Sequence, residues 1–206
     1  MGKIKDVYAQ TENPYLNLYE LKAVNKKGGE FSYYLASRGK KPENLKLNTR
    51  KNSPDGVVIF GVKKGKTKQE DRIVLVRQYR YTIDDYIYEL PAGLVEEGED
   101  FHQAAVREMR EETGLILHPL KTDSGYERPF FTTIGMTDES CAAVYGYVEG
   151  ETSGQFQEDS EEIEVILADR REAARILREE NAAIMCAYHL MHFLRDEDVF
   201  AFLNLS

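Results

Sequence analysis

Three glutamates in one short segment have the type and spacing to hold a divalent cation. Glu108, Glu111 and Glu112 lie close together on one side of a helix, with Glu108 and Glu112 one turn apart. Like charges this close destabilise a helix unless a cation compensates them, and acids near its C-terminal end oppose its dipole. Carboxylate oxygens suit Mg²⁺ or Mn²⁺ better than zinc. The alternative is a solvated acidic helix balanced by Arg107 and Arg110.

The residues around these glutamates form a longer pattern. Residues 93–115 read GLVEEGEDFHQAAVREMREETGL. Five residues separate Gly93 from Glu99, and seven more lead to Arg107. The order is then Arg-Glu-apolar-any-Glu-Glu-any-Gly-apolar, which matches the Nudix signature at every fixed position. A chance match in a chain of this length is on the order of 10⁻⁷, so the chain resembles the Nudix family.

The resemblance implies a fold and a reaction. Nudix proteins fold as a mixed sheet between helices, so the expected class is α/β (mixed α+β), a Nudix α/β/α sandwich with a small N-terminal β-element. Residues 77–81 (RQYRY), 89–93 (ELPAG) and 135–139 (GMTDE) are similar to the ADP-ribose and nucleotide-sugar pyrophosphatase subfamily. That subfamily usually has proline before the glycine of the last segment, where this chain has Ile134. This departure concerns the substrate, whereas the hydrolase assignment depends on the signature.

Residue roles follow from the same resemblance. Glu108 and Glu112 are expected to bind Mg²⁺, for which Mn²⁺ can substitute, together with the backbone carbonyl of Ala92 and the side chain of Glu161. The substrate-binding set is expected to consist of Arg80, which contacts the diphosphate or terminal ribose, with Arg77, Glu89 and Gly93. Arg107 lies four residues before Glu111 and can pair with it, fixing its rotamer.

A further acid is expected from the loop after the signature. The stretch 158–162, Glu-Asp-Ser-Glu-Glu, lies just before an apolar strand candidate. Glu161 is the first choice for activating water, and Asp159 and Glu162 are next. The predicted catalytic set is therefore Glu161, Asp159, Glu112, Glu111 and Arg107.

The predicted reaction is Mg²⁺-dependent cleavage of a nucleoside diphosphate derivative, with ADP-ribose giving AMP and ribose 5-phosphate. A loop carboxylate would take the proton of the attacking water, and no covalent nucleophile is needed. Nucleotide sugars and dinucleoside polyphosphates stay open as substrates. A non-catalytic nucleotide-binding sensor would be expected to lack metal glutamates, which this chain retains, and a structural acidic domain would show no magnesium-dependent ligand binding.

Elements that position these residues can be assigned from periodicity and turn residues. Residues 15–24 and 30–38 are β-rich, and the polar segment 39–54 follows them. Further strands are expected at 57–62, 73–76, 86–90, 126–133, 141–148 and 163–167, and helices at 100–113, 170–179 and 182–194. The expected domains are 1–50, a β-element that dimerises because a lone hairpin is marginal in water, and 51–206, the Nudix domain.

Composition and charge limit the classes of binding partner that we expect. The chain has 206 residues and a net charge of −9, which argues against a nucleic-acid-binding surface. No apolar run approaches the ~18 residues of a membrane span, and the first residues lack the apolar core of a signal peptide. Cys141 and Cys186 are expected to be free thiols. We therefore expect a cytoplasmic homodimer acting on a small molecule, without a nucleic-acid or membrane partner.

Overall fold

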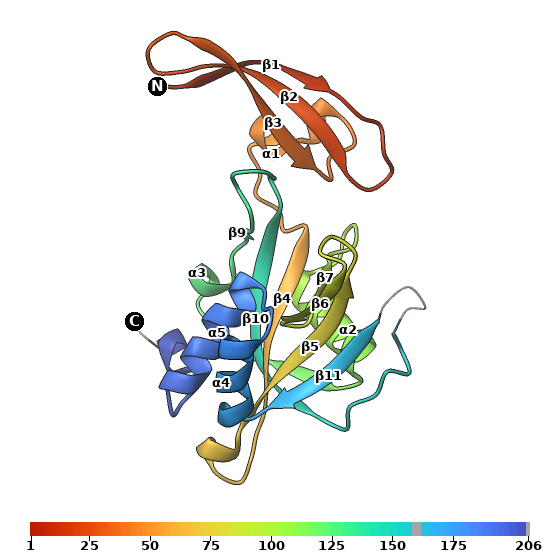
Figure 1. Cartoon of the computed structure of the whole chain (residues 1–206), viewed down its shortest axis with the longest axis vertical. Coiled ribbons are helices and arrows are strands. Elements are labelled where there is room, and N and C mark those ends of the chain that lie inside the picture. The colour runs from red at the N-terminus through yellow and green to blue at the C-terminus, as the bar shows by residue number, and fades with distance from the viewer. Residues whose placement is uncertain (158–161, 205–206) are drawn as a thin grey trace. The chain divides into compact units, whose positions relative to one another are not determined.

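Two compact units make up the chain. The structure, a computed structural model, describes residues 1–157 and 162–204 (Figure 1). The N-terminal unit consists of Met1–Asp55 together with Pro129–Cys141, and the larger unit of Gly56–Arg128 together with Ala142–Ser206. The chain therefore leaves the N-terminal unit and returns to it once.

The N-terminal unit contains a three-stranded antiparallel sheet in the order β1 (Lys3–Ala9), β2 (Asn17–Val24), β3 (Glu30–Ser37). The expected strands at 15–24 and 30–38 correspond to β2 and β3. Strand β1 was not expected, because it is an edge strand whose side chains are mostly exposed and show no apolar alternation. Alternate residues of β2 are buried, and Tyr19 and Leu21 pack with Leu35 and Leu45 in a small core.

The segment 39–54, expected as a polar linker, contains short helical turns that supply part of this core. They are η1 (Pro42–Asn44) and α1 (Lys46–Thr49). Leu45, between them, is fully buried against the sheet, whereas its neighbours are at least partly exposed. Two leucines, Leu45 and Leu47, in a Lys- and Asn-rich stretch give no clear periodicity, so the sequence could not show this packing.

The loop 129–141 is hydrogen-bonded to strand β3. The backbone N–H of Ala36 donates to the carbonyl oxygen of Met136 at 2.9 Å, and Ala36 forms a parallel bridge with Thr137. The Tyr33 hydroxyl donates to the carbonyl oxygen of Gly135 at 2.5 Å. The loop thus extends the N-terminal sheet at its β3 edge.

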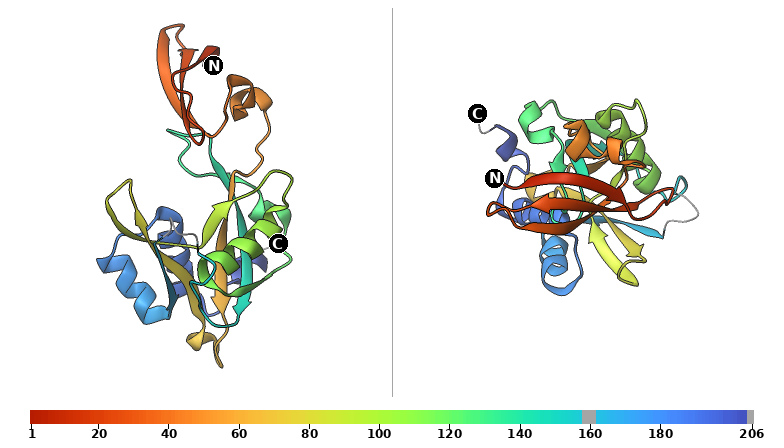
Figure 2. Two further views of the ribbon diagram at one scale, coloured as in Figure 1. Left: turned by 90° about the vertical axis from the view of Figure 1, so that its right-hand side faces the viewer. Right: turned by 90° about the horizontal axis from the view of Figure 1, so that it is seen from above.

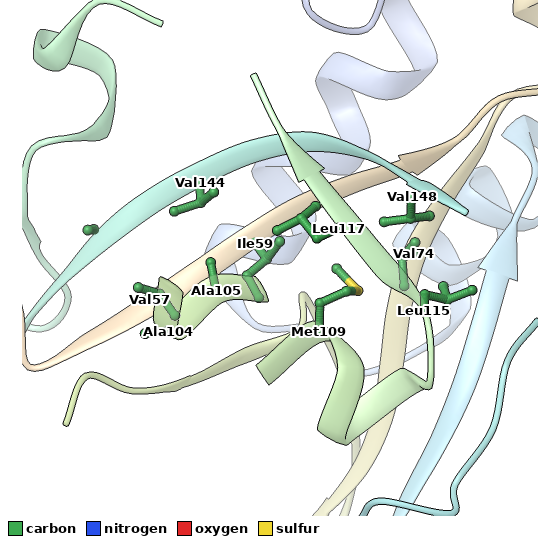
Figure 3. Close-up of a cluster of buried hydrophobic side chains, with 11 residues drawn as sticks. Val57, Ile59, Val74, Ala104, Ala105, Met109, Leu115, Leu117, Val144 and Val148 are labelled. Atoms are coloured by element: carbon green, nitrogen blue, oxygen red, sulfur yellow. The ribbon is translucent and has the colours of Figure 1, made fainter. Parts of the chain in front are cut away.

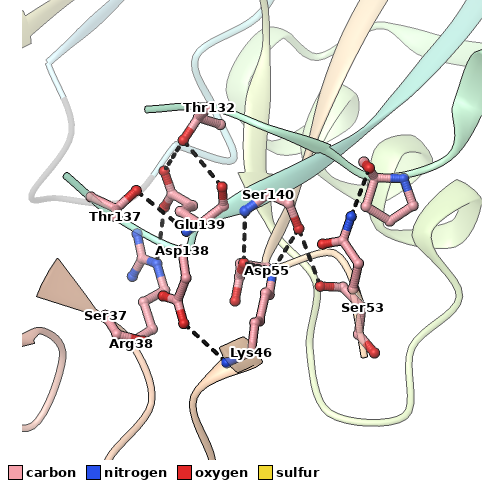
Figure 4. Close-up of polar contacts among 12 residues, drawn as sticks. Ser37, Arg38, Lys46, Ser53, Asp55, Thr132, Thr137, Asp138, Glu139 and Ser140 are labelled. Atoms are coloured by element: carbon pink, nitrogen blue, oxygen red, sulfur yellow. Dashed lines mark hydrogen bonds and ion pairs between the residues drawn. The ribbon is translucent and has the colours of Figure 1, made fainter. Parts of the chain in front are cut away.

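Polar side chains fix the end of this loop (Figure 4). The Asp55 carboxylate accepts hydrogen bonds from the Lys46 ammonium at 2.6 Å and from the Ser140 backbone N–H at 2.9 Å. The Arg38 guanidinium pairs with Glu139 at 3.2 Å. The Ser140–Asp55 and Arg38–Glu139 contacts join the loop to the first 55 residues, and these parts form one unit.

The larger unit contains most of an eight-stranded sheet. Strand β9 and the first residues of β10 belong to the N-terminal unit. The main path of the sheet has the order β11-β5-β4-β10-β8. The path consists of β4 (Gly56–Lys63), β5 (Arg72–Arg80), β8 (Ile116–Pro119), β10 (Ser140–Glu149) and β11 (Ile163–Ala168). Beside the path, β6 (Asp85–Glu89) pairs with β5, β7 (Ala92–Leu94) with β4, and β9 (Phe130–Phe131) with β10.

Helices cover both faces of this sheet. Helix α2 (Phe101–Thr113) lies on one face, and α4 (Arg170–Glu179) and α5 (Ile184–Arg195) on the other (Figure 2). Val57 and Ile59 of β4 pack with α2 in a buried apolar cluster (Figure 3), whereas the Phe60 ring lies 4.9 Å from the His189 ring of α5. This confirms the predicted α/β/α sandwich.

Local signals set the bounds of α2. The Asp100 carboxylate accepts a hydrogen bond from the His102 backbone N–H at 2.9 Å and caps the first turn. Gly114 ends the helix with a φ of 75°, a conformation that favours glycine. Ala104, Ala105 and Met109 are fully buried against the sheet. The helix expected at 100–113 is thereby confirmed, with Asp100 as its cap.

Most other expected elements are confirmed with small shifts of their ends, but the strand expected at 126–133 is wrong. The short helix α3 (Ser124–Glu127) and the two-residue β9 occupy this segment. The Asp123 carboxylate accepts from the Gly125 N–H at 2.7 Å, which favours a turn, and Pro129 has no N–H to donate to a ladder. The remaining short turns are η2 (Lys68–Glu70) and η3 (Ala201–Asn204). Among the described residues, no helix is long and apolar enough to cross a membrane.

Candidate active site

Strand β7 and helix α2 approach each other closely at one pair of residues. A Cβ atom built on Gly93 would lie 1.9 Å from the Glu108 Cδ atom. Any side chain at position 93 would therefore occupy the space of the Glu108 carboxylate, which is 14% exposed. Glycine at position 93 allows Glu108 to lie directly over the backbone of β7.

Glu112 reaches the same backbone from one helical turn further along. Glu112 is only 4% exposed, and its Oε2 atom accepts a hydrogen bond from the Ala92 N–H at 3.1 Å. The side chains of Glu108 and Glu112 thus both approach the backbone of Ala92–Gly93. The structure places the Ala92 backbone beside Glu112, and the role of its carbonyl as a metal ligand stays a prediction.

Arg107 organises the acids of the signature. Its guanidinium contacts both oxygens of Glu99 at 3.0 Å, and its Nη1 atom donates to Glu108 at 2.8 Å and to Glu111 at 2.9 Å. Its Nη2 atom also donates to the Leu94 carbonyl oxygen at 3.0 Å. The expected Arg107–Glu111 pair is confirmed, and the same side chain also holds Glu108.

These contacts shift the titration of both partners. Hydrogen bonds from Arg107, and from the Glu96 backbone N–H, hold the pKa of Glu99 below its ordinary value. Hydrogen bonds to Glu99, and then to Glu108 and Glu111, raise the pKa of Arg107, although burial opposes this. Arg107 therefore stays a cation, and Glu99 stays ionised to lower pH than an isolated glutamate.

The acids of α2 differ in what they offer to a ligand. Glu111 is 46% exposed at its side chain and pairs with Arg107, so it faces solvent more than Glu108 does. Among residues 1–157 and 162–204, no group of three or more His, Cys, Asp or Glu side chains comes together as a metal site. The described part of the site consists of two carboxylates and backbone atoms, to which a third acid would have to be added.

Three of the predicted substrate-binding residues lie on the β5–β6 hairpin, and the fourth, Gly93, lies on β7. Arg80 and Glu89 form an ion pair with 2.6 Å between Nε and Oε2. The Arg77 guanidinium lies 4.1 Å above the Tyr86 ring and pairs with Glu164 at 3.5 Å. Arg77 thus contacts a residue of β11, whereas Arg80 pairs with Glu89 of β6.

The predicted loop acids can be placed only in part. Glu161 and Asp159 lie outside the described residues. Glu162 accepts a hydrogen bond from the Tyr86 hydroxyl, and this contact raises the pKa of Tyr86. The Tyr79 backbone N–H donates to the Glu162 carbonyl oxygen at 3.2 Å, which fixes the start of β11 beside β5.

Sequence reasoning missed two features of this region. Glu99 was recognised only as a fixed position of the signature, although its carboxylate binds Arg107 through two hydrogen bonds. Glu127, within the strand wrongly expected at 126–133, is a buried carboxylate whose Oε2 atom lies 3.2 Å from the His102 Nε2 atom. The fixed position of Glu99 in the signature could have indicated its contact with Arg107. No local signal indicated the buried Glu127 carboxylate.

Comparison with known proteins is consistent with this geometry. Nudix hydrolase 2 of Caenorhabditis elegans is 38% identical over 125 residues, covering 57% of this chain and 53% of the relative. The ADP-sugar pyrophosphatase of Mus musculus is 42% identical over 73 residues, covering 35% and 33%. The ADP-ribose pyrophosphatase of Saccharomyces cerevisiae is 36% identical over 83 residues, covering 40% and 36%. The chain thus spans about half the length of these relatives, or less.

A solved structure, a crystal structure of an ADP compounds hydrolase, shares the fold. It superposes with a TM-score of 0.59 at 15% identity, covering 86% of this chain and 83% of that one. The sequence pattern of the NUDIX domain matches residues 53–188, which is more than half of the chain and includes α2 and both of its neighbouring loops. The chain therefore belongs to the Nudix family.

Proposed function

We propose that the protein hydrolyses the pyrophosphate bond of a nucleoside diphosphate derivative in a Mg²⁺-dependent reaction, with ADP-ribose as substrate and AMP and ribose 5-phosphate as products. The observation that carries this proposal is the convergence of Glu108 and Glu112 on the backbone of Ala92 and Gly93. Two carboxylates in one partly buried site favour a bound cation, and their oxygens suit Mg²⁺.

The donor set fits a hard cation. Glu112 is 4% exposed, and its carboxylate accepts a hydrogen bond from the Ala92 N–H. In the proposed site Glu108 and Glu112 hold Mg²⁺ or Mn²⁺, with the Ala92 carbonyl and with Glu161, which is outside the described residues. When bound, the cation neutralises the diphosphate and lowers the pKa of a water molecule.

The chain's own residues do the rest of the work in this mechanism. Arg107 fixes the carboxylates of Glu108 and Glu111, so that the charges are oriented before substrate arrives. Glu161 takes the proton of the attacking water, with Asp159 as the alternative. Arg80 binds the diphosphate or terminal ribose, and its ion pair with Glu89 holds the guanidinium in place.

No covalent nucleophile takes part. Burial raises the pKa of the Cys141 thiol to about 11 and that of Cys186 to about 12, so neither forms a thiolate at neutral pH. Both cysteines are free. Direct attack of water on phosphorus is the step that this site supports.

Substrate identity rests on relatives that differ. The Saccharomyces cerevisiae and Bacillus subtilis relatives are ADP-ribose pyrophosphatases, whereas the Mus musculus relative is an ADP-sugar pyrophosphatase. We place ADP-ribose first and a nucleotide sugar second. Incubation with ADP-ribose, ADP-glucose and a diadenosine polyphosphate, with products identified by mass spectrometry, tests this order. Faster turnover of either rival compound would reassign the substrate while leaving the reaction class intact.

One pair of variants tests the metal site. EDTA should abolish hydrolysis, and added Mg²⁺ or Mn²⁺ should restore it. Glu112→Gln keeps the side-chain shape and removes one charge, so kcat should fall ~10²-fold or more, roughly 2.7 kcal/mol of transition-state stabilisation. Glu97→Gln, an exposed residue among the signature's spacers, is the matched control and should keep wild-type kcat. Near-wild-type kcat for Glu112→Gln at saturating Mg²⁺ would refute the assignment.

We also propose that the protein is a homodimer in which the first ~50 residues contact the partner, because a small sheet buries little core alone. Phe31 and Tyr33 lie across from Ala23 and Leu21, so they share the face that carries the small core. Phe31 is nevertheless 46% exposed and Tyr33 is 41% exposed. Such exposed apolar area on a small sheet is typical of an interaction surface.

A further inference from the structure

The solvent-facing side of helix α2 lines a cavity, which Arg107 and Glu111 of the proposed site also border. It encloses about 720 Å³, which lies within the range of roughly 300–1,000 Å³ typical of small-molecule sites. Gln103, Val106 and Arg110 of α2 form one wall, and Pro119 of β8 and Phe156 form the other. Met109, Ala105 and the carboxylate of Glu112 lie on the opposite, sheet-facing side of the helix.

Arg110 is the distinctive residue of this cavity. Its guanidinium lies 5.1 Å from the centre of the Phe156 ring. Among the residues that the structure describes, no carboxylate pairs with Arg110, whereas neighbouring Arg107 contacts three carboxylates. An arginine without an acidic partner in a chain of net charge −9 leaves local positive charge available for an anion.

The contact with the Phe156 ring is within the range of a cation–π interaction. The planar N–H donors of a guanidinium match the two oxygens of a carboxylate or phosphate. Phe156 and Val106 are 43% and 36% exposed, so apolar surface lies beside the donors.

We propose that this cavity binds a small organic anion, in which a carboxylate or phosphate pairs with the edge of Arg110 and an apolar body packs against Val106 and Phe156. The Gln103 side-chain amide can donate or accept one further hydrogen bond at the rim. Glu108 and Glu112 do not line this cavity, whereas Arg107 and Glu111 do. Binding here requires no divalent cation and does not rest on the proposed hydrolysis.

Calorimetric titration of the whole chain in EDTA tests the proposal. The probes are 2-naphthoate and AMP, with 2-naphthylmethanol and adenosine as neutral counterparts. At least one anion should bind with a Kd at least tenfold below that of its neutral counterpart, because only the anion forms charge-assisted hydrogen bonds with the guanidinium. Binding of 2-naphthoate alone would identify a carboxylate ligand, and binding of AMP alone a phosphate ligand.

Variants locate the binding. Arg110→Gln should raise the Kd of the anion ~10-fold or more, and Arg110→Lys should raise it less, because lysine keeps the charge and loses the planar fork. Arg171→Gln, an exposed arginine of α4, is the matched control and should leave the Kd unchanged. Arg110→Lys carries the test if the glutamine variant fails to fold. The proposal is overturned if neither anion binds at millimolar concentration, if the neutral compounds bind equally well, or if folded Arg110 variants keep the wild-type Kd.

Discussion

Replacing Gly93 by alanine would test how strictly the site depends on one missing methyl group. The new Cβ would lie 1.9 Å from the Glu108 Cδ atom, whereas ordinary contacts begin at 3.4 Å. The carboxyl group must therefore move by 3.4 − 1.9 = 1.5 Å if the backbone stays in place. Because the clashing atoms are the far end of a flexible side chain, the movement should cost little stability and much function.

The displacement sets the expected size of the effect. Misplacing a catalytic group by about 1 Å can cost ~10²-fold in rate, so we expect kcat of Gly93→Ala to fall by that factor or more, about 2.7 kcal/mol. The Mg²⁺ concentration for half-maximal activity should rise, since Glu108 would no longer lie over β7. The Tm should fall by only a few degrees, which for a chain of this size corresponds to about 1–2 kcal/mol.

A double-mutant cycle separates this cause from a general disturbance of the fold. Steady-state kinetics over a Mg²⁺ series and thermal unfolding without metal would be measured for Gly93→Ala, Glu108→Ala and the double variant. If the clash with Glu108 carries the effect, Gly93→Ala should change little in the Glu108→Ala background, where the clashing atoms are gone. An equal loss in both backgrounds would show that the methyl group acts on something other than Glu108.

The remaining predictions concern substrate binding, pH and association. If Arg80 binds ground and transition states alike, Arg80→Ala should raise KM more than it lowers kcat in steady-state kinetics. Glu89→Gln, which removes the ion-pair partner of Arg80, should raise KM by a smaller factor. In the folded chain the pKa of Glu99 lies below its ordinary value of 4.5, so the ionised carboxylate stabilises the fold above pH 4.5. This stabilisation is lost as the pH falls through the folded pKa. In urea unfolding, the free energy of unfolding of Glu99→Gln should therefore fall less between neutral and acid pH than that of wild type. Light scattering at micromolar concentration should give twice the chain mass, and a monomer would contradict the proposed role of the first ~50 residues.

The elements nearest the candidate site could be predicted because their signals are local. Helix α2 has a capping aspartate, apolar residues at helical spacing and a terminal glycine, all within fifteen positions of the chain. Asp100 and Gly114 therefore fixed both ends before any tertiary contact was known. The pairing of Arg107 with Glu111 was also predictable, since four residues on a helix always bring two side chains to the same side.

The remaining contacts of Arg107 were not predictable in this way. Glu99 lies before the helix, and its carboxylate reaches the guanidinium only because the loop from Leu94 turns back over α2. No periodicity describes such a loop. The ion pair between Arg80 and Glu89 was missed for a related reason. The two residues are not direct partners in the register of β5 and β6, in which Arg80 lies opposite Asp85 and Glu89 opposite Val76.

The loop 129–141 shows most clearly what local reasoning cannot supply. Its partners in the N-terminal unit are about 100 positions away: the Tyr33 hydroxyl binds the Gly135 carbonyl, and Arg38 pairs with Glu139. The backbone bond from Ala36 to Met136 involves no side chain, so no residue type could indicate it. The predicted domain boundary at residue 50 separates the first strands from the loop 129–141 that they bind. Removing them would leave buried or half-buried polar groups of this loop without partners, and the cost of such groups is the physical reason why loop and strands form one unit.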